Sequence, residues 1–134
     1  MKDEELKEAL STCKTVAVVG ISPKEDRPSY IVASYLKKKG YHIIPVRPDG
    51  DYILGEKVYP NLTEIPKEVE VDVVDIFRRS EDVPPIVEEA IQRVAKVIWM
   101  QEGVVHQEAG AKAEKAGLKV VMDRCMKKEH QRLL

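Results

Sequence analysis

The sequence has no apolar run close to the roughly 20 residues that a membrane-spanning helix needs. Its amino terminus, residues 1–5, is charged and lacks the apolar core of a secretion signal, so we expect a cytoplasmic protein. The chain has only two cysteines, Cys13 and Cys125, and no C-x-x-C pair. A disulfide framework is therefore excluded, and the cysteine content suits a reducing compartment.

Neither sign of charge predominates, because 22 lysines and arginines face 23 aspartates and glutamates. No broad positive field is available to hold nucleic acid or an anionic membrane surface. A small anionic ligand held by a few local cations remains compatible with this balance. Aromatic residues are scarce, at 5%, while 34% of residues are charged, a composition that can accompany surface ion-pair networks.

The chain has no internal repeat and no low-complexity tract. Its 134 residues suit one domain, 1–134, and leave no room for a second catalytic domain. Any function must therefore fit on one sheet and its loops.

Five apolar segments, several of them rich in β-branched residues, predict five strands. They are residues 15–19, 41–46, 71–77, 97–100 and 118–122. Helices are expected over 3–10, from an N-cap at Ser29 to Gly40, over 84–94 and 105–116, and from Cys125 onward. Residues 52–65 suggest a short strand or hairpin with irregular turns, and Pro45 suits a strand end better than a central ladder.

Strands that alternate with helices require a parallel sheet with right-handed crossovers. With the first strand at the centre, we expect the strand order 3-2-1-4-5. The predicted fold is a three-layer, Rossmann-like α/β sandwich around a five-stranded, mostly parallel sheet. In such sheets a ligand lies at the carboxyl ends of the strands, where the winding reverses.

The loop after the first strand reads Gly20, Ile21 and Ser22, followed by Arg27 and the start of a helix. The G-x-G-x-x-G signature of dinucleotide folds is absent. One glycine that lets a phosphate approach the backbone, free first-turn amides and a nearby cation nevertheless predict a diphosphate cradle. The alternative is an ordinary strand-to-helix turn with Arg27 on the surface.

The second strand ends in Pro45-Val46-Arg47-Pro48, where dinucleotide folds usually carry an acid that holds the ribose. A cation at that position suits a ribose that bears an additional phosphate, which favours coenzyme A or NADP. The alternative is a surface ion pair between Arg47 and Asp49 or Asp51.

Three further strand ends carry polar or charged loops. These are Phe77-Arg78-Arg79, Gln101-Glu102-Gly103 and Asp123-Arg124-Cys125. The first offers an apolar ring beside cations, which could cover an adenine, a pantetheine chain or a phosphate, although Phe77 is equally suited to the core.

No group of residues indicates catalysis or a metal site. The histidines, at positions 42, 106 and 130, have no carboxylate spacing typical of a triad or of metal ligands. Cys125 follows a strand end, and its thiol could form a mixed disulfide with the sulfhydryl group of CoA.

Several stretches together resemble the small stand-alone CoA-binding proteins, a family similar to the amino-terminal CoA domain of the succinyl-CoA synthetase alpha subunit. The resemblance extends over about residues 15–133. The matching stretches are Val18–Ser22, Arg27–Tyr30, Gly40-Tyr41 with Ile44–Val46, Leu54–Tyr59, Val71–Arg78, Trp99–Gln101 with Gly103-Val104, and Asp123–Cys125. The family commonly has asparagine at the position of Arg47.

The resemblance implies that the loop 20–22 and Arg27 hold the diphosphate of CoA and that residues 46–48 flank the adenosine and its ribose phosphate. The segments 77–78 and 101–103 would line the pantetheine side. The larger synthetases also need a phosphorylated histidine segment and a nucleotide-grasp domain, and neither fits in this chain.

We therefore predict a nucleotide-binding protein that is a binding module for CoA or an acyl-CoA rather than an enzyme. The predicted ligand-contacting residues are Gly20, Ile21, Ser22, Arg27, Ser29, Pro45, Val46, Arg47, Pro48, Phe77, Arg78, Arg79, Gln101, Glu102 and Gly103. An NADP-dependent reductase and a CoA-binding subunit of a separately encoded acyl-CoA synthetase are the alternatives. Leu133 and Leu134 could support a homodimer.

Overall fold

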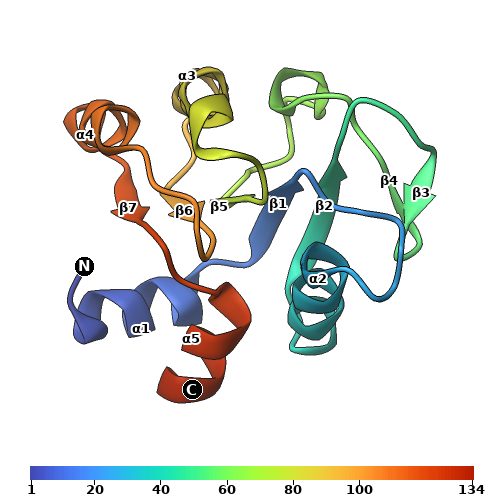
Figure 1. Cartoon of the computed structure of the whole chain (residues 1–134), viewed down its shortest axis with the longest axis horizontal. Coiled ribbons are helices and arrows are strands. Elements are labelled where there is room, and N and C mark those ends of the chain that lie inside the picture. Colours follow the sequence, from blue (N-terminus) through green and yellow to red (C-terminus); the bar gives the residue numbers. More distant parts are fainter.

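A computed structural model describes all residues, 1–134, as five α-helices around one five-stranded sheet and a small hairpin (Figure 1). The elements are α1 (Asp3–Thr12), β1 (Thr15–Val19), α2 (Pro28–Lys38), β2 (His42–Val46), β3 (Tyr52–Ile53), β4 (Glu56–Lys57), η1 (Leu62–Glu64), β5 (Val73–Ile76), η2 (Ser80–Asp82), α3 (Val83–Gln92), β6 (Val97–Met100), α4 (Gln107–Lys115), β7 (Lys119–Val121) and α5 (Met126–Leu133). The helices and strands confirm the predicted α/β class, and the β3–β4 hairpin confirms the expectation for residues 52–65.

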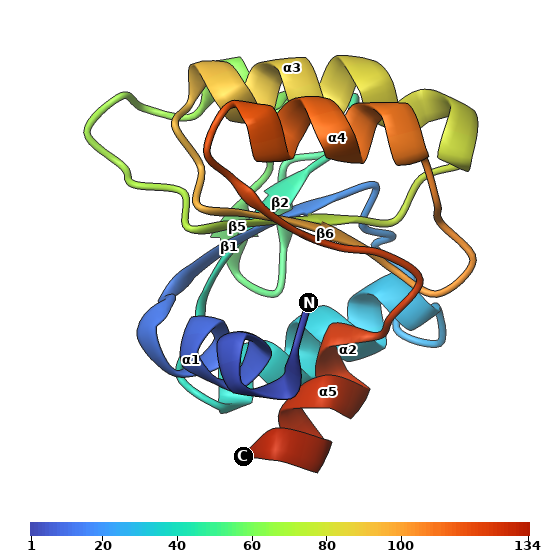
Figure 2. The same ribbon diagram turned by 90° about the vertical axis from the view of Figure 1, so that its left-hand side faces the viewer.

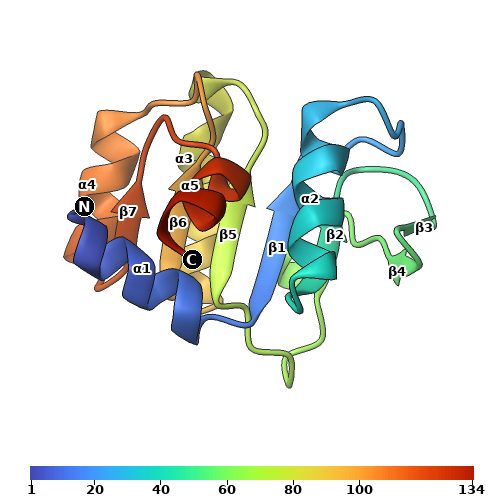
Figure 3. The same cartoon turned by 90° about the horizontal axis from the view of Figure 1, so that it is seen from below.

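The sheet is the middle of three layers (Figure 2). Helices α3 and α4 cover one face, and α1, α2 and α5 cover the other (Figure 3). Each face packs against its own cluster of 20 buried apolar residues. Neighbouring residues of a strand alternate between the clusters: Val18 points toward α1, α2 and α5, whereas Val19 points toward α3 and α4. Both faces are covered, which explains why the strands read as nearly continuous apolar runs.

All five main strands are parallel, but their order is β2-β1-β5-β6-β7. The expected order 3-2-1-4-5 is therefore wrong, because the third long strand, β5, pairs with β1 and leaves β2 at the edge. Pro45 accounts for this placement. Proline has no amide hydrogen to donate to a second neighbouring strand, so its strand belongs at an edge. The outer side of β2 is instead met by Tyr59, whose amide donates to the carbonyl oxygen of Pro45.

This order places the reversal of winding between β1 and β5. The chain leaves β1 toward α2 on one face of the sheet and leaves β5 toward α3 on the other. The loops that follow these two strands therefore diverge from neighbouring strand ends. The space between such loops is the position where parallel sheets bind ligands.

None of the helices combines the length and the apolar character that crossing a bilayer requires. At the carboxyl terminus, Leu133 packs against the protein's own core, and Leu134 is exposed. Of the two residues suggested for a dimer contact, Leu134 is therefore exposed and Leu133 is half-buried.

Candidate functional site

A cleft of about 740 Å³ opens at the carboxyl ends of β1, β5 and β6. It lies beside the first turn of α2 and the residue that precedes α5. Its lining residues are Gly20, Ser22, Arg27, Pro28, Ser29, Val32, Phe77, Arg78, Arg79, Asp82, Gln101, Glu102, Val104 and Cys125. Nine of the predicted residues are thus brought together, from loops that are far apart in the sequence.

The loop after β1 depends on Gly20. Its φ angle of 88° lies in the left-handed region, and a Cβ atom added to it would stand 2.3 Å from the carbonyl oxygen of Phe77 and 2.8 Å from Cδ of Arg78. The expected reason for this glycine, room for a phosphate at the backbone, therefore needs correction. The space beside its α-carbon is taken by the β5–α3 loop, and the glycine allows the two loops to touch.

Ser29 was expected to be the N-cap of α2, but the N-cap is Arg27, two residues earlier, and the helix begins at Pro28. Proline suits the first helical position because its missing amide hydrogen needs no partner there. Ser29 is buried, and its Oγ accepts a 2.9 Å hydrogen bond from the amide of Ser22. This bond fixes the glycine loop to the helix. The amides of Ser29 and Tyr30 have no acceptor in the chain and remain available to an anion.

The three arginines of the cleft differ in their partners. Arg27, just before α2, is exposed and forms no ion pair. Arg78 and Arg79 both donate to Oδ2 of Asp82, each over 3.3 Å, and Arg79 also lies 3.1 Å from Glu81. The hydrogen bond from Arg79 lowers the pKa of Asp82 below its ordinary value, so this carboxyl group is charged at neutral pH.

Arg47 lies outside the large cleft, in a neighbouring hollow of about 80 Å³ that it shares with Val46, Pro48 and Arg78. Its guanidinium donates to Oδ1 of Asp49 over 2.8 Å and to the carbonyl oxygen of Ile21 over 3.4 Å. The ion pair with Asp49, one of the two interpretations considered for Arg47, is therefore present. Contact with a ribose phosphate stays a prediction, and Arg78, which lines both spaces, connects them.

Three other predicted contacts are not in the lining. The side chain of Ile21 is buried in the core, and Pro45 lies within β2. The amide of Gly103 donates to Oδ1 of Asp123 over 2.7 Å, which ties together the loops after β6 and β7. None of these three residues lines the cleft.

Gln101 reaches the cleft, but its amide group serves the fold. Its Nε2 donates to the carbonyl oxygen of Arg124 over 3.1 Å, and its Oε1 accepts a 3.4 Å bond from the amide of Met126. The same carbonyl oxygen accepts a 2.8 Å bond from Nε1 of Trp99. The side chains of Trp99 in β6 and of Gln101 just after it thus hold the chain where it enters α5, which places Cys125 at the cleft.

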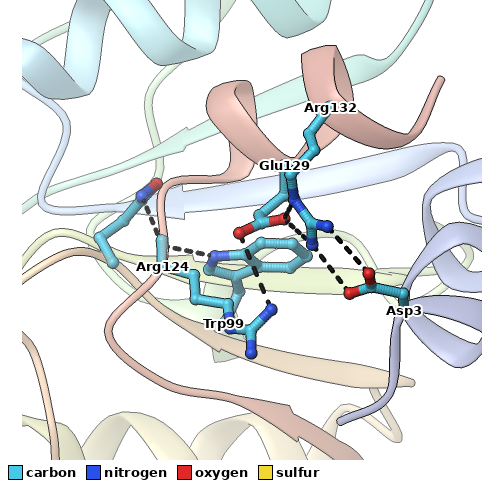
Figure 4. Close-up of polar contacts among 6 residues, drawn as sticks. Asp3, Trp99, Arg124, Glu129 and Arg132 are labelled. Atoms are coloured by element: carbon cyan, nitrogen blue, oxygen red, sulfur yellow. Dashed lines mark hydrogen bonds and ion pairs between the residues drawn. The ribbon is translucent and has the colours of Figure 1, made fainter.

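An ion-pair network on the outer side of this junction joins both ends of the chain (Figure 4). Arg132 donates to Asp3 over 2.9 Å and to Glu129 over 2.6 Å, and Arg124 lies 3.8 Å from Glu129. Helix α5 is thereby fixed to α1. Arg132 and Asp3 are exposed, whereas the side chain of Glu129 between the two arginines is only 15% exposed, and we assign the network to positioning of α5.

The predicted ligand contacts did not include Pro28, Val32, Asp82, Val104 and Cys125, of which Cys125 was considered only for a mixed disulfide. Val32 and Val104 could not be distinguished from other core residues. The sequence does contain a signal for Asp82. It stands at the N-cap position of α3, where a side chain normally accepts an amide hydrogen, but the following Pro84 and Pro85 have none to donate.

Phe77 combines the two interpretations considered for it, since its ring packs against the core cluster and also lines the cleft. His106 heads α4, as expected, and its Nδ1 accepts the amide of Ala109 over 3.1 Å. His130 is hydrogen bonded to the hydroxyl of Tyr35 over 2.7 Å.

Comparison with known proteins connects this geometry to a family. A model of the CoA binding domain matches residues 14–131. The uncharacterized protein YneT of Bacillus subtilis strain 168 is 42% identical over 126 residues, which cover 94% of this chain and 92% of YneT. A solved structure of a hypothetical protein from Pyrococcus horikoshii OT3 is 42% identical, with a TM-score of 0.95 over 99% of this chain and 92% of that one.

The ADP-forming acetate–CoA ligase II of Archaeoglobus fulgidus is 32% identical over 111 residues. These residues cover 80% of this chain but 16% of the ligase, so the chain corresponds to one segment of a much larger enzyme. The match of nearly the whole chain to the family model, together with these relatives, establishes the family. The protein belongs to the CoA-binding domain family.

Proposed function

We propose that the protein binds coenzyme A, free or acylated, in the cleft between α2, the β5–α3 loop and the start of α5. The observation that carries this proposal is the meeting of Arg27, Arg78 and the unpartnered amides of the first turn of α2 at the point where the sheet reverses its winding. Such a site is suited to a diphosphate, because amides and a helix N-terminus favour negative charge.

The two connected spaces suit the length of the ligand. The cleft extends past Phe77 to Val104 and Cys125, which offers apolar contact to a pantetheine chain. The smaller hollow beside Arg47 and Pro48 lies at the other end. In this arrangement the adenosine end occupies the β2 side and the thiol end points toward Cys125.

Calorimetric titration tests the proposal and the role of Arg47 together. CoA binds the wild type more tightly than dephospho-CoA, by about tenfold for one charge-assisted contact with the ribose phosphate. The variant Arg47→Gln binds the two ligands equally, and Lys38→Gln, at the far end of α2, keeps the difference. Absence of heat with CoA would refute the proposal, and equal affinities in the wild type would remove Arg47 from it. NADPH in place of CoA tests the reductase alternative, which a saturable titration would support.

The ligases favour a second candidate, in which this protein is the CoA-binding subunit of a separately encoded synthetase. The supporting observation is that the domain forms 16% of the Archaeoglobus ligase and 21% of the alpha subunit of the Pyrococcus furiosus acetate–CoA ligase I. Co-purification of the other synthetase domains with the tagged protein from native extract tests it. Recovery of the protein without such domains contradicts this candidate and leaves CoA binding untouched.

A further inference from the structure

Asp82 lies between the two arginines of the β5–α3 loop, inside the cleft. Its Oδ2 accepts bonds from Nη2 of Arg78 and Nε of Arg79, both over 3.3 Å, and its Oδ1 accepts Nη2 of Arg79 over 3.5 Å. The side chain of Asp82 is 21% exposed, and all three residues line the cleft. One carboxylate thus occupies the position between two guanidinium groups that face the ligand space.

Asp82 stands at the N-cap position of α3, but its carboxylate does not cap the helix. Asp82 is the residue before α3, where a side-chain oxygen normally accepts the amide of the second or third helical residue. Those residues are Pro84 and Pro85, which have no amide hydrogen. The side chain accordingly makes no capping bond, and the arginines are its only partners in the chain.

The bonds of Asp82 are long for ion pairs. Charge-assisted bonds between nitrogen and oxygen usually measure about 2.7–2.9 Å, and in this same protein Arg132 forms bonds of 2.9 Å to Asp3 and 2.8 Å to Glu129. The bonds from Arg78 and Arg79 to Asp82 exceed it, at 3.3–3.5 Å. A phosphate group, with more charge and more acceptor oxygens, can therefore replace this carboxylate.

Arg78 lies where its guanidinium can bond either to Asp82 or to a phosphate group in the cleft. Its Cδ lies against Gly20, so the stem of the side chain crosses the loop after β1, while its Nη2 reaches Asp82. A small rotation of the guanidinium therefore moves it from the carboxylate toward the loop. Arg27, in the same cleft, has no such competitor.

We propose that Asp82 is an intramolecular competitor of the ligand's phosphates and a residue that sets the affinity of the site. In the free protein it holds Arg78 and Arg79 together and offsets their repulsion. On binding, a phosphate or diphosphate group takes its place. This inference rests on the proposed function for the identity of the natural ligand but not for the exchange itself, which any diphosphate can report.

The test is titration of the wild type and two variants with inorganic pyrophosphate and, separately, with CoA. Asp82→Asn, which keeps the shape and removes the charge, binds pyrophosphate about tenfold more tightly than the wild type does. Glu81→Gln is the matched control, because it removes an equal charge beside Arg79 from a residue that does not line the cleft. Its affinity stays within about twofold of the wild type. Asp82→Ser gives the same direction as Asp82→Asn and covers the case in which one variant folds poorly.

Equal or weaker binding of pyrophosphate by both Asp82 variants overturns the inference, since the carboxylate would then orient the arginines for the ligand. Equal strengthening by Glu81→Gln also overturns it, because general charge would be the cause. If the wild type does not bind CoA but Asp82→Asn binds pyrophosphate more tightly than the wild type does, the proposed function is refuted and the exchange at Asp82 is supported. CoA binding by the wild type with no gain in the variants does the reverse.

Discussion

The α-carbon of Gly20 lies against the carbonyl group of Phe77, so that a Cβ atom at position 20 would stand 2.3 Å from that oxygen. This contact joins the loops after β1 and β5, the two strands between which the sheet reverses its winding. The shape of the candidate site therefore depends on a residue with no side chain.

Replacing Gly20 by alanine is expected to destabilise the protein and to separate the two loops. The left-handed φ angle costs about 1–2 kcal/mol for any other residue, and overpacking against a backbone atom adds about 1–3 kcal/mol. Gly117→Ala is the matched control, because Gly117 has a φ of 98° and nothing within 4 Å of its Cβ position. Urea unfolding of both variants checks this. An equal loss of stability in the two would show that the contact with Phe77 has no cost.

Asp75 provides a prediction about pH. It lies in β5 between Val18 and Trp99, it is fully buried, and neither carboxyl oxygen has a hydrogen-bond partner. Burial raises the pKa of Asp75 well above its ordinary value. A raised pKa means that the contribution to stability is complete below the unfolded pKa and is lost as the pH rises through the folded pKa.

The variant Asp75→Asn should therefore gain stability relative to the wild type as the pH rises, by at most about 1.4 kcal/mol per pH unit. Asp72 is the opposing control. Burial raises its pKa, but hydrogen bonds from the amides of Lys14 and Thr15 and from Lys96 outweigh this, so the pKa is lowered. Its contribution is present above the unfolded pKa and lost as the pH falls. Unfolding at several pH values measures both, and parallel curves for wild type and Asp75→Asn would contradict the prediction.

Arg27 should control affinity without affecting the fold. It is exposed, has no ion-pair partner and lies beside the free amides of α2. Arg27→Gln is expected to weaken CoA binding by about tenfold or more, since a hydrogen bond to a charged group contributes about 1.5–3 kcal/mol. Its melting temperature should equal that of the wild type. Unchanged affinity in a calorimetric titration would place the diphosphate elsewhere.

Cys125 tests the direction in which the ligand lies. The protein is incubated with CoA disulfide, whose sulfur is attacked by the Cys125 thiolate; a new sulfur–sulfur bond forms and one CoA leaves as its thiolate. Intact-mass measurement without reductant should detect one CoA adduct, absent in Cys125→Ser and retained in Cys13→Ser. Both cysteines are buried, but Cys125 lines the cleft and Cys13 does not. Adduct formation at Cys13 alone, or none at all, would contradict a thiol end placed near α5.

The strands were predictable because both faces of the sheet are covered, which makes segments such as Val16–Val19 and Val73–Val74 continuously apolar. Their order was predicted wrongly, although the missing amide hydrogen of Pro45 indicates an edge position for β2. A cleft does lie at the strand ends, where the rule for parallel sheets predicts a ligand, and binding of a ligand there stays a prediction. The hydrogen-bond partners in the cleft could not be predicted from the sequence. The bonds between Ser22 and Ser29 and between Arg78 and Asp82 depend on how the loops fold.

Electron density for the ligand itself is the most direct test of the central claim that this cleft receives CoA. A crystal of protein purified without removal of endogenous ligand, and supplemented with CoA, should contain the diphosphate against the first turn of α2 beside Arg27, with the thiol end near Cys125. CoA bound at another surface, or a cleft that stays empty at saturating CoA, would contradict the account.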